Sequence, residues 1–149
     1  MSYKPHDSYF KKAKQEGYRS RAAYKLLELQ QRYRLMKSGD RVIDLGAAPG
    51  GWLQVVARII GQSGKVVGVD LEPIQPLSQS NVFVLRGDIS SDDVRQRIYQ
   101  FLGGPANCIL SDLAPKLSGI RDADMARSLE LNRMALAVAT RLLRPGGAL

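Results

Sequence analysis

A glycine-rich turn and the carboxylates that follow it are the residues of this chain best suited to binding a ligand. The turn extends from Asp44 to Trp52 and reads Asp-Leu-Gly-Ala-Ala-Pro-Gly-Gly-Trp. Glycines let the backbone approach a bound molecule closely, and a helix that begins after such a turn presents unpaired N–H groups. The pattern therefore indicates a polar ligand at a helix N-terminus.

The spacing of the glycines restricts the class of ligand that the turn can bind. Gly46, Gly50 and Gly51 depart from the G-x-G-x-x-G pattern of dinucleotide sites, because Ala48 takes the middle place. A ligand with a ribose but no pyrophosphate needs less backbone at close approach, which favours S-adenosylmethionine over NAD. An oxidoreductase that uses a nucleotide is therefore disfavoured.

Acidic residues follow the predicted strands and have the chemistry of ribose and adenine recognition. Asp70, roughly 20 residues beyond the turn, stands where a carboxylate accepts hydrogen bonds from ribose hydroxyls. Asp88 is a candidate acceptor for the adenine amino group. Trp52 forms either an apolar wall of this site or part of the core, and for Asp70 the alternative is a cap on the next turn.

Two further residues are candidates for the reaction itself. Asp112 opens an Asp-Leu-Ala-Pro segment that combines a carboxylate with a rigid turn, and turn capping is its alternative role. Lys25 borders the apolar stripe of a predicted helix over Arg19–Leu29, for which Ser20 is a plausible cap. Either Lys25 reaches inward, or its stem lies along the core with the ammonium in water.

These residues require an α/β fold whose parallel strands bring their carboxyl ends to one edge. Runs rich in Val, Ile and Leu predict strands, and apolar residues at helical spacing predict helices between them. The predicted strands are 41–45, 65–70, 82–86 and 106–112, and the predicted helices are 51–60, 92–102 and 124–143.

Length and charge favour one domain that binds nucleic acid. The 149 residues carry a net charge of +8, and residues 1–41 hold 11 of the 22 Lys and Arg residues and five of the six tyrosines. Such a segment suits contact with phosphates and bases, although a solvated basic arm has the same composition. We divide the single domain 1–149 into a basic, RNA-facing segment 1–38 and a cofactor-binding part 39–149.

The apolar stretches and the cysteine content indicate where the protein is located in the cell and whether it forms a disulfide. No stretch reaches the roughly 18 apolar residues of a membrane span, and the N-terminus lacks the apolar core of a signal peptide, so a cytoplasmic protein is expected. The single cysteine, Cys108, cannot form an intrachain disulfide and reads as a buried hydrophobe. No metal site and no obligate protein partner are expected.

Several motifs together resemble the FtsJ/RrmJ family of ribosomal RNA 2′-O-ribose methyltransferases. They are residues 20–26, the strand and glycine turn 42–52, Arg86-Gly87-Asp88 and 111–115. The resemblance implies a Rossmann-like, three-layer αβα fold and S-adenosylmethionine as donor. It also implies methylation of a uridine 2′-hydroxyl in large-subunit ribosomal RNA, on the assembled subunit. No membrane is expected as a partner.

The resemblance also assigns roles to single residues. It places Gly50, Trp52, Asp70, Asp88 and Asp112 in the cofactor site, and it makes Lys25 and Asp112 two members of a Lys-Asp-Lys-Glu catalytic set. The family's base lysine and its glutamate lie beyond Leu149, and Lys116 reads as a loop residue.

The last strands of the family's sheet lie beyond Leu149 as well. We therefore expect this chain to bind better than it turns over, and we expect the strand 106–112 to be an exposed sheet edge that lowers stability. The alternative from another class is a non-catalytic RNA-binding module that uses the basic segment alone.

Overall fold

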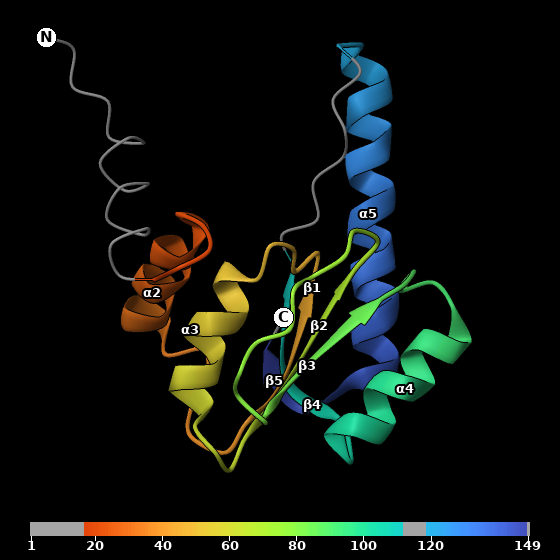
Figure 1. The fold of residues 1–149 in the computed structure, drawn as a ribbon. Helices are drawn as coiled ribbons and strands as arrows, with labels where there is room; N and C mark the ends of the chain where they lie inside the picture. Colours follow the sequence, from red (N-terminus) through yellow and green to blue (C-terminus); the bar gives the residue numbers. More distant parts are fainter. Residues whose placement is uncertain (1–16, 112–118, 149) are drawn as a thin grey trace, which may run out of the picture.

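The computed structural model describes residues 17–111 and 119–148 as a parallel sheet between helices (Figure 1). Its elements, in chain order, are α2 (Ala22–Tyr33), β1 (Arg41–Leu45), α3 (Gly51–Ile60), β2 (Lys65–Asp70), β3 (Val82–Arg86), α4 (Asp92–Leu102), β4 (Ala106–Ser111), α5 (Arg121–Leu142) and β5 (Leu143–Ala148). Within the described ranges, no helix has the length and apolar character needed to cross a membrane.

The five strands lie in the order β3-β2-β1-β4-β5, and all neighbouring pairs are parallel. The strand order therefore reverses at β1, between β2 and β4. In open α/β sheets this reversal creates a ligand site beyond the carboxyl ends of the strands. The loop that leaves β1, which is the glycine-rich turn, lies at that place.

Two apolar cores, one on each face of the sheet, establish the three-layer αβα architecture. Successive side chains of a strand point to opposite faces, so Val42 of β1 packs with α2 and α3, whereas Ile43 packs with α4 and α5. On the first face α3 packs closely on β2 at Gly68, which has no side chain. A Cβ there would lie 2.6 Å from the Leu53 side chain. Burial on both faces explains why these strands are continuous apolar runs.

Most predicted boundaries are confirmed, and the deviations have physical causes. The first three strands and the helices 51–60 and 92–102 have the predicted bounds. The last helix begins three residues earlier than predicted, at Arg121. The predicted helix 19–29 instead spans Ala22–Tyr33, and Ser20 does not cap it through its side chain. Ala23 N–H is bonded to the Ser20 backbone carbonyl at 3.4 Å instead.

The expectation that the fourth strand is a sheet edge is wrong. β5 pairs with β4 through Ala106–Leu143 and Cys108–Ala148, with an irregular register between them. The Arg-Pro-Gly-Gly segment, residues 144–147, thus belongs to a short edge strand. Proline is tolerated on an edge strand because one side of it makes no ladder bonds.

Helix α5 buries only part of the apolar pattern that predicts it. Ala135, Val138 and Leu142 are buried against the sheet, whereas Met125 and Leu129 are 56% and 57% exposed. Figure 1 shows why, since the first half of α5 extends beyond the strands. The periodicity identifies a helix correctly, but the buried residues lie only in its second half.

Candidate functional site

The glycine loop, residues 46–50, is held against the end of β2 by its own backbone. Gly46 and Ala47 N–H groups both donate to the Val69 carbonyl, at 2.8 and 3.1 Å. Gly46 has a φ of 74° and Gly50 has a φ of 115°, a region that glycine occupies without a steric penalty. The chain thus reverses at the carboxyl end of β1 and enters α3 at Gly51.

The carboxylate of Asp70 joins this loop to the loop that follows β2. One oxygen accepts the Ala48 N–H at 2.9 Å, and the other accepts the Glu72 N–H at 2.9 Å. Asp70 therefore does cap a turn, which was the alternative to ribose binding. The two roles are compatible, because each carboxylate oxygen has a second lone pair for a hydroxyl donor and the side chain is only half-buried.

Asp88 lies at the neighbouring strand end, two residues beyond β3. Gly87 N–H donates to the Asp70 carbonyl at 2.9 Å, which ties the two strand ends together. One Asp88 oxygen accepts both the backbone N–H and the hydroxyl of Ser90, at 2.9 and 2.8 Å. These bonds lower the pKa of Asp88, and the backbone bond is the larger cause. An ionised, exposed carboxylate of this kind is suited to accept an amino group.

Asp44 is the exception among the acids near the strand ends. It lies within β1, opposite Gly68 of β2 and Leu110 of β4, and its side chain is 1% exposed. Its burial places it inside the sheet below the glycine loop, and Asp70 and Asp88 are the two described acids at the strand ends themselves.

Trp52 lies in the first turn of α3 and is only 8% exposed. Its indole N–H donates to the Ala22 carbonyl at 2.8 Å, and its ring belongs to the core between α2 and the sheet. The structure thus favours the core role over an apolar wall. Trp52 also links the glycine loop to the helix that carries Lys25.

Lys25, on α2, is exposed, and its ammonium makes no hydrogen bond or ion pair with another residue in the described part of the chain. Its prediction as a catalytic residue stays a prediction. Asp112, the other predicted catalytic residue, lies outside the described residues, as does Lys116. The structure therefore places Gly50, Trp52 and Asp70 at the glycine loop and Asp88 at the next strand end, and it places Lys25 on the helix that packs against α3.

Arg19 is a residue of this site that the sequence does not reveal. Its guanidinium donates to the carbonyls of Pro49, Gln75 and Pro76. We assigned the basic segment to RNA contacts, so this arginine is used differently from that prediction. No local signal identifies its acceptors, because backbone carbonyls exist at every position and these are 30 to 57 residues away.

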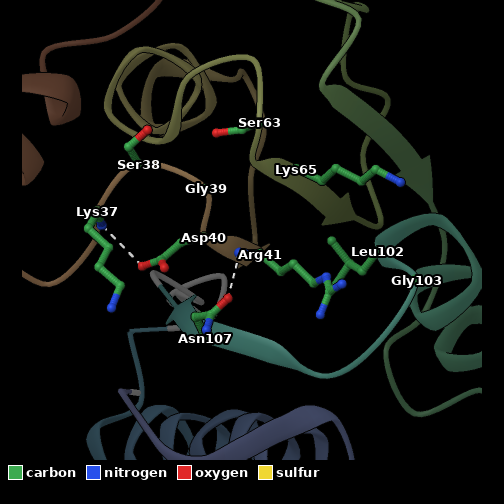
Figure 2. A pocket seen from close by; sticks show the side chains of 10 residues that line it. All are labelled: Lys37, Ser38, Gly39, Asp40, Arg41, Ser63, Lys65, Leu102, Gly103 and Asn107. Atoms are coloured by element: carbon green, nitrogen blue, oxygen red, sulfur yellow. Dashed lines mark hydrogen bonds between the residues drawn. The ribbon is translucent and has the colours of Figure 1, made fainter.

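A cavity of about 450 Å³ lies at the amino ends of β1 and β2, opposite the glycine loop at the carboxyl ends (Figure 2). The first residues of β1 and β2, Arg41 and Lys65, line it together with Leu102 and Gly103 at the end of α4. Lys65 Nζ donates to the Phe101 carbonyl at 3.2 Å, as expected for a cation beside a helix C-terminus. This cavity is separate from the glycine loop, and among the described residues no cluster of metal-ligating side chains occurs.

Comparison with known proteins places these features in a family. The model of the FtsJ-like methyltransferase family matches residues 18–149. A protein of Methanothrix thermoacetophila named ribosomal RNA large subunit methyltransferase E is 52% identical over 142 residues, which are 95% of this chain and 54% of that protein. A protein of the same name from Syntrophobacter fumaroxidans is 50% identical over 147 residues, or 99% of this chain and 74% of its own length.

Solved structures show the same fold. A ribosomal RNA methyltransferase from Plasmodium falciparum has a TM-score of 0.77 at 31% identity, covering 85% of this chain and 73% of that one. Fibrillarin from Aeropyrum pernix, solved with bound S-adenosyl-L-methionine, has a TM-score of 0.50 at 23% identity, with coverages of 84% and 52%. The chain spans about half of the Methanothrix relative and about three quarters of the Syntrophobacter relative.

Proposed function

Because the chain belongs to the FtsJ-like methyltransferase family, we propose that it carries the cofactor-binding part of a ribosomal RNA methyltransferase. The reaction is transfer of a methyl group from S-adenosylmethionine to the 2′-hydroxyl of a uridine ribose in large-subunit ribosomal RNA. The substrate is the RNA within the assembled large subunit, and the enzyme acts in the cytoplasm. The names of the relatives support the class of RNA.

The observation that carries this proposal is the Asp70 carboxylate, which bonds the glycine loop at the end of β2. A ribose seated on this loop has a carboxylate acceptor beside it, and Asp88 offers a second acceptor at the next strand end. These two acceptors therefore fit the donors of a nucleoside, which are its ribose hydroxyls and its amino group. Gly50 enters α3 with a φ of 115°, which glycine adopts without a steric penalty, and Trp52 ties the first turn of α3 to the Ala22 carbonyl.

The chemistry requires the 2′-oxygen to lie opposite the leaving group and to lose its proton as the new bond forms. S-adenosylmethionine, when bound, supplies the electrophilic methyl carbon. Lys25 and Asp112 would orient the hydroxyl, and a cation at Lys25 would help to lower the pKa of a neighbouring lysine base. We expect the 149-residue chain, which contains these two members of the catalytic set, to bind the cofactor but to methylate slowly.

Calorimetric titration of Asp70→Asn with S-adenosylmethionine tests the proposal. The amide keeps the shape of the carboxylate, but it cannot accept the two backbone bonds and the ribose hydroxyls together. We expect the affinity to fall at least about tenfold, since hydrogen bonds to a charged group are worth about 1.5–3 kcal/mol.

Asp93→Asn is the matched control, because Asp93 is an exposed acid in the first turn of α4. It should bind the cofactor as the unaltered chain does. Equal affinity of Asp70→Asn and Asp93→Asn, or preferential binding of NAD by the unaltered chain, would contradict the proposal.

A further inference from the structure

Three carbonyls from two loops converge on the guanidinium of Arg19. Nη1 donates to the Pro49 carbonyl at 2.9 Å and to the Gln75 carbonyl at 2.5 Å, and Nη2 donates to the Pro76 carbonyl at 3.1 Å. Pro49 belongs to the glycine loop, and the other two lie in the loop between β2 and β3. One side chain thus connects the two loops that leave β1 and β2.

The glycine loop is therefore held at two successive residues by two different charges. Asp70 accepts the Ala48 N–H, and Arg19 donates to the Pro49 carbonyl. Gly50 permits this arrangement, because a Cβ there would lie 2.8 Å from Arg19 Nη1. The path of the loop thus depends on a cation outside the sheet as well as on the carboxylate at the end of β2.

The backbone of the same segment is fixed to α3. Arg19 N–H donates to the Gln54 side-chain oxygen at 2.7 Å, and the Gln54 amide donates to the Gly17 carbonyl at 2.9 Å. One turn further along, Trp52 bonds the Ala22 carbonyl. The segment that leads into α2 and Lys25 is therefore fixed to the first turns of α3, directly beside the glycine loop.

From these contacts we propose that Arg19 is a positioning residue for the cofactor site. It holds the glycine loop and the loop after β2 in one arrangement, and it fixes the start of α2 to that arrangement. This inference rests on the proposed function, because the ligand of the loop is taken to be S-adenosylmethionine. A lysine cannot replace Arg19 fully, since an ammonium lacks the planar, two-nitrogen fork that reaches separate carbonyls.

The test compares Arg19→Ala, Arg19→Lys and the unaltered chain by calorimetry with S-adenosylmethionine. We expect the alanine variant to bind roughly tenfold to a hundredfold more weakly, because two loops must be ordered when the ligand binds. The lysine variant should recover only part of the loss. Methylguanidinium added to Arg19→Ala should restore binding in a concentration-dependent manner, which a general loss of fold would not permit.

Arg97→Gln is the control for the loss of one positive charge, because Arg97 is exposed on α4, on the other face of the sheet. It should bind with unchanged affinity. Unchanged affinity in Arg19→Ala, or a weakened affinity that methylguanidinium does not restore, would overturn the positioning role while the Asp70→Asn result still supports the proposed function. Failure of the unaltered chain to bind S-adenosylmethionine would overturn both.

Discussion

Asp70 and Asp88 lie at adjacent strand ends, but their carboxylates are bonded differently. Asp70 uses both oxygens to hold the backbones of two loops, whereas Asp88 concentrates its bonds from Ser90 on one oxygen. The first arrangement fixes the site and the second leaves an oxygen for a ligand donor. Residue type alone does not distinguish these roles, because the difference arises from the neighbouring N–H groups.

Substitution of Ser90 by alanine tests the electrostatics of Asp88. The ionised carboxylate accepts both Ser90 bonds, so folding lowers the pKa of Asp88 below its ordinary value of 3.8. The stabilisation is present above the unfolded pKa and is lost as the pH falls through the lower folded pKa. In Ser90→Ala the backbone bond remains, so the pKa of Asp88 should rise part of the way toward 3.8.

Carboxyl carbon chemical shifts followed against pH measure this change directly. Ser91→Ala is the control, because the Ser91 side chain makes no capping bond at the start of α4. An identical titration of Asp88 in both variants would show that the Ser90 hydroxyl has no influence on the carboxylate.

At the scale of elements, the packing of α2 against α3 decides where Lys25 lies. Tyr18, Ala23 and Leu26 are buried in the core shared with α3, and Arg58 of α3 donates to the Tyr18 hydroxyl at 2.7 Å. Ser20, just before α2, lies close to Gly51, since a Cβ on Gly51 would collide with the Ser20 Oγ. Gly51 is therefore needed for packing as well as for the start of α3.

Gly51→Ala should destabilise the protein by about 1–3 kcal/mol, as expected for an added methyl group in a tightly packed interface. The double variant Ser20→Ala, Gly51→Ala should regain much of that loss, because the nearest atoms to the added Cβ are then the backbone N and the Cβ of residue 20, at 3.3 and 3.4 Å. Urea unfolding of both single variants and the double variant gives the coupling free energy. Additive effects of the two substitutions would show that this contact does not limit the packing.

At the scale of the whole molecule, the positive charge and the parallel sheet lie in different parts of the sequence. The net charge of +8 comes largely from the first 41 residues, whereas the sheet and its helices supply the proposed cofactor site. Among the described cations, Arg19 is committed to loop carbonyls, so under the proposed function the attraction for RNA would depend on the remaining basic residues. Ligand affinity and RNA affinity should therefore respond differently to salt.

Binding of a large-subunit ribosomal RNA fragment should weaken at least about a hundredfold between about 50 mM and 200 mM salt, because phosphate contacts release counterions. The affinity for S-adenosylmethionine should change far less over that range. Filter binding for the RNA and calorimetry for the cofactor measure the two in parallel. An RNA affinity that is insensitive to salt would contradict the role given to the basic segment.

The sequence determined most of the elements and predicted the place of the ligand site. The bounds of the first three strands followed from continuous apolar runs, which burial on both faces requires. The glycine turn and Asp70 predicted a cofactor site at the carboxyl ends of the strands, because both signals are local. The buried thiol of Cys108 was likewise readable from its apolar run, and burial raises its pKa to about 11.

Only the tertiary structure decided which residues meet. The acceptors of Arg19, the core position of Trp52, the pairing of β5 with β4 and the exposed face of α5 all depend on contacts between distant segments. Such contacts join backbone groups that are identical at every position, or faces that become covered only after packing. A linear pattern of residue types therefore carries no record of them.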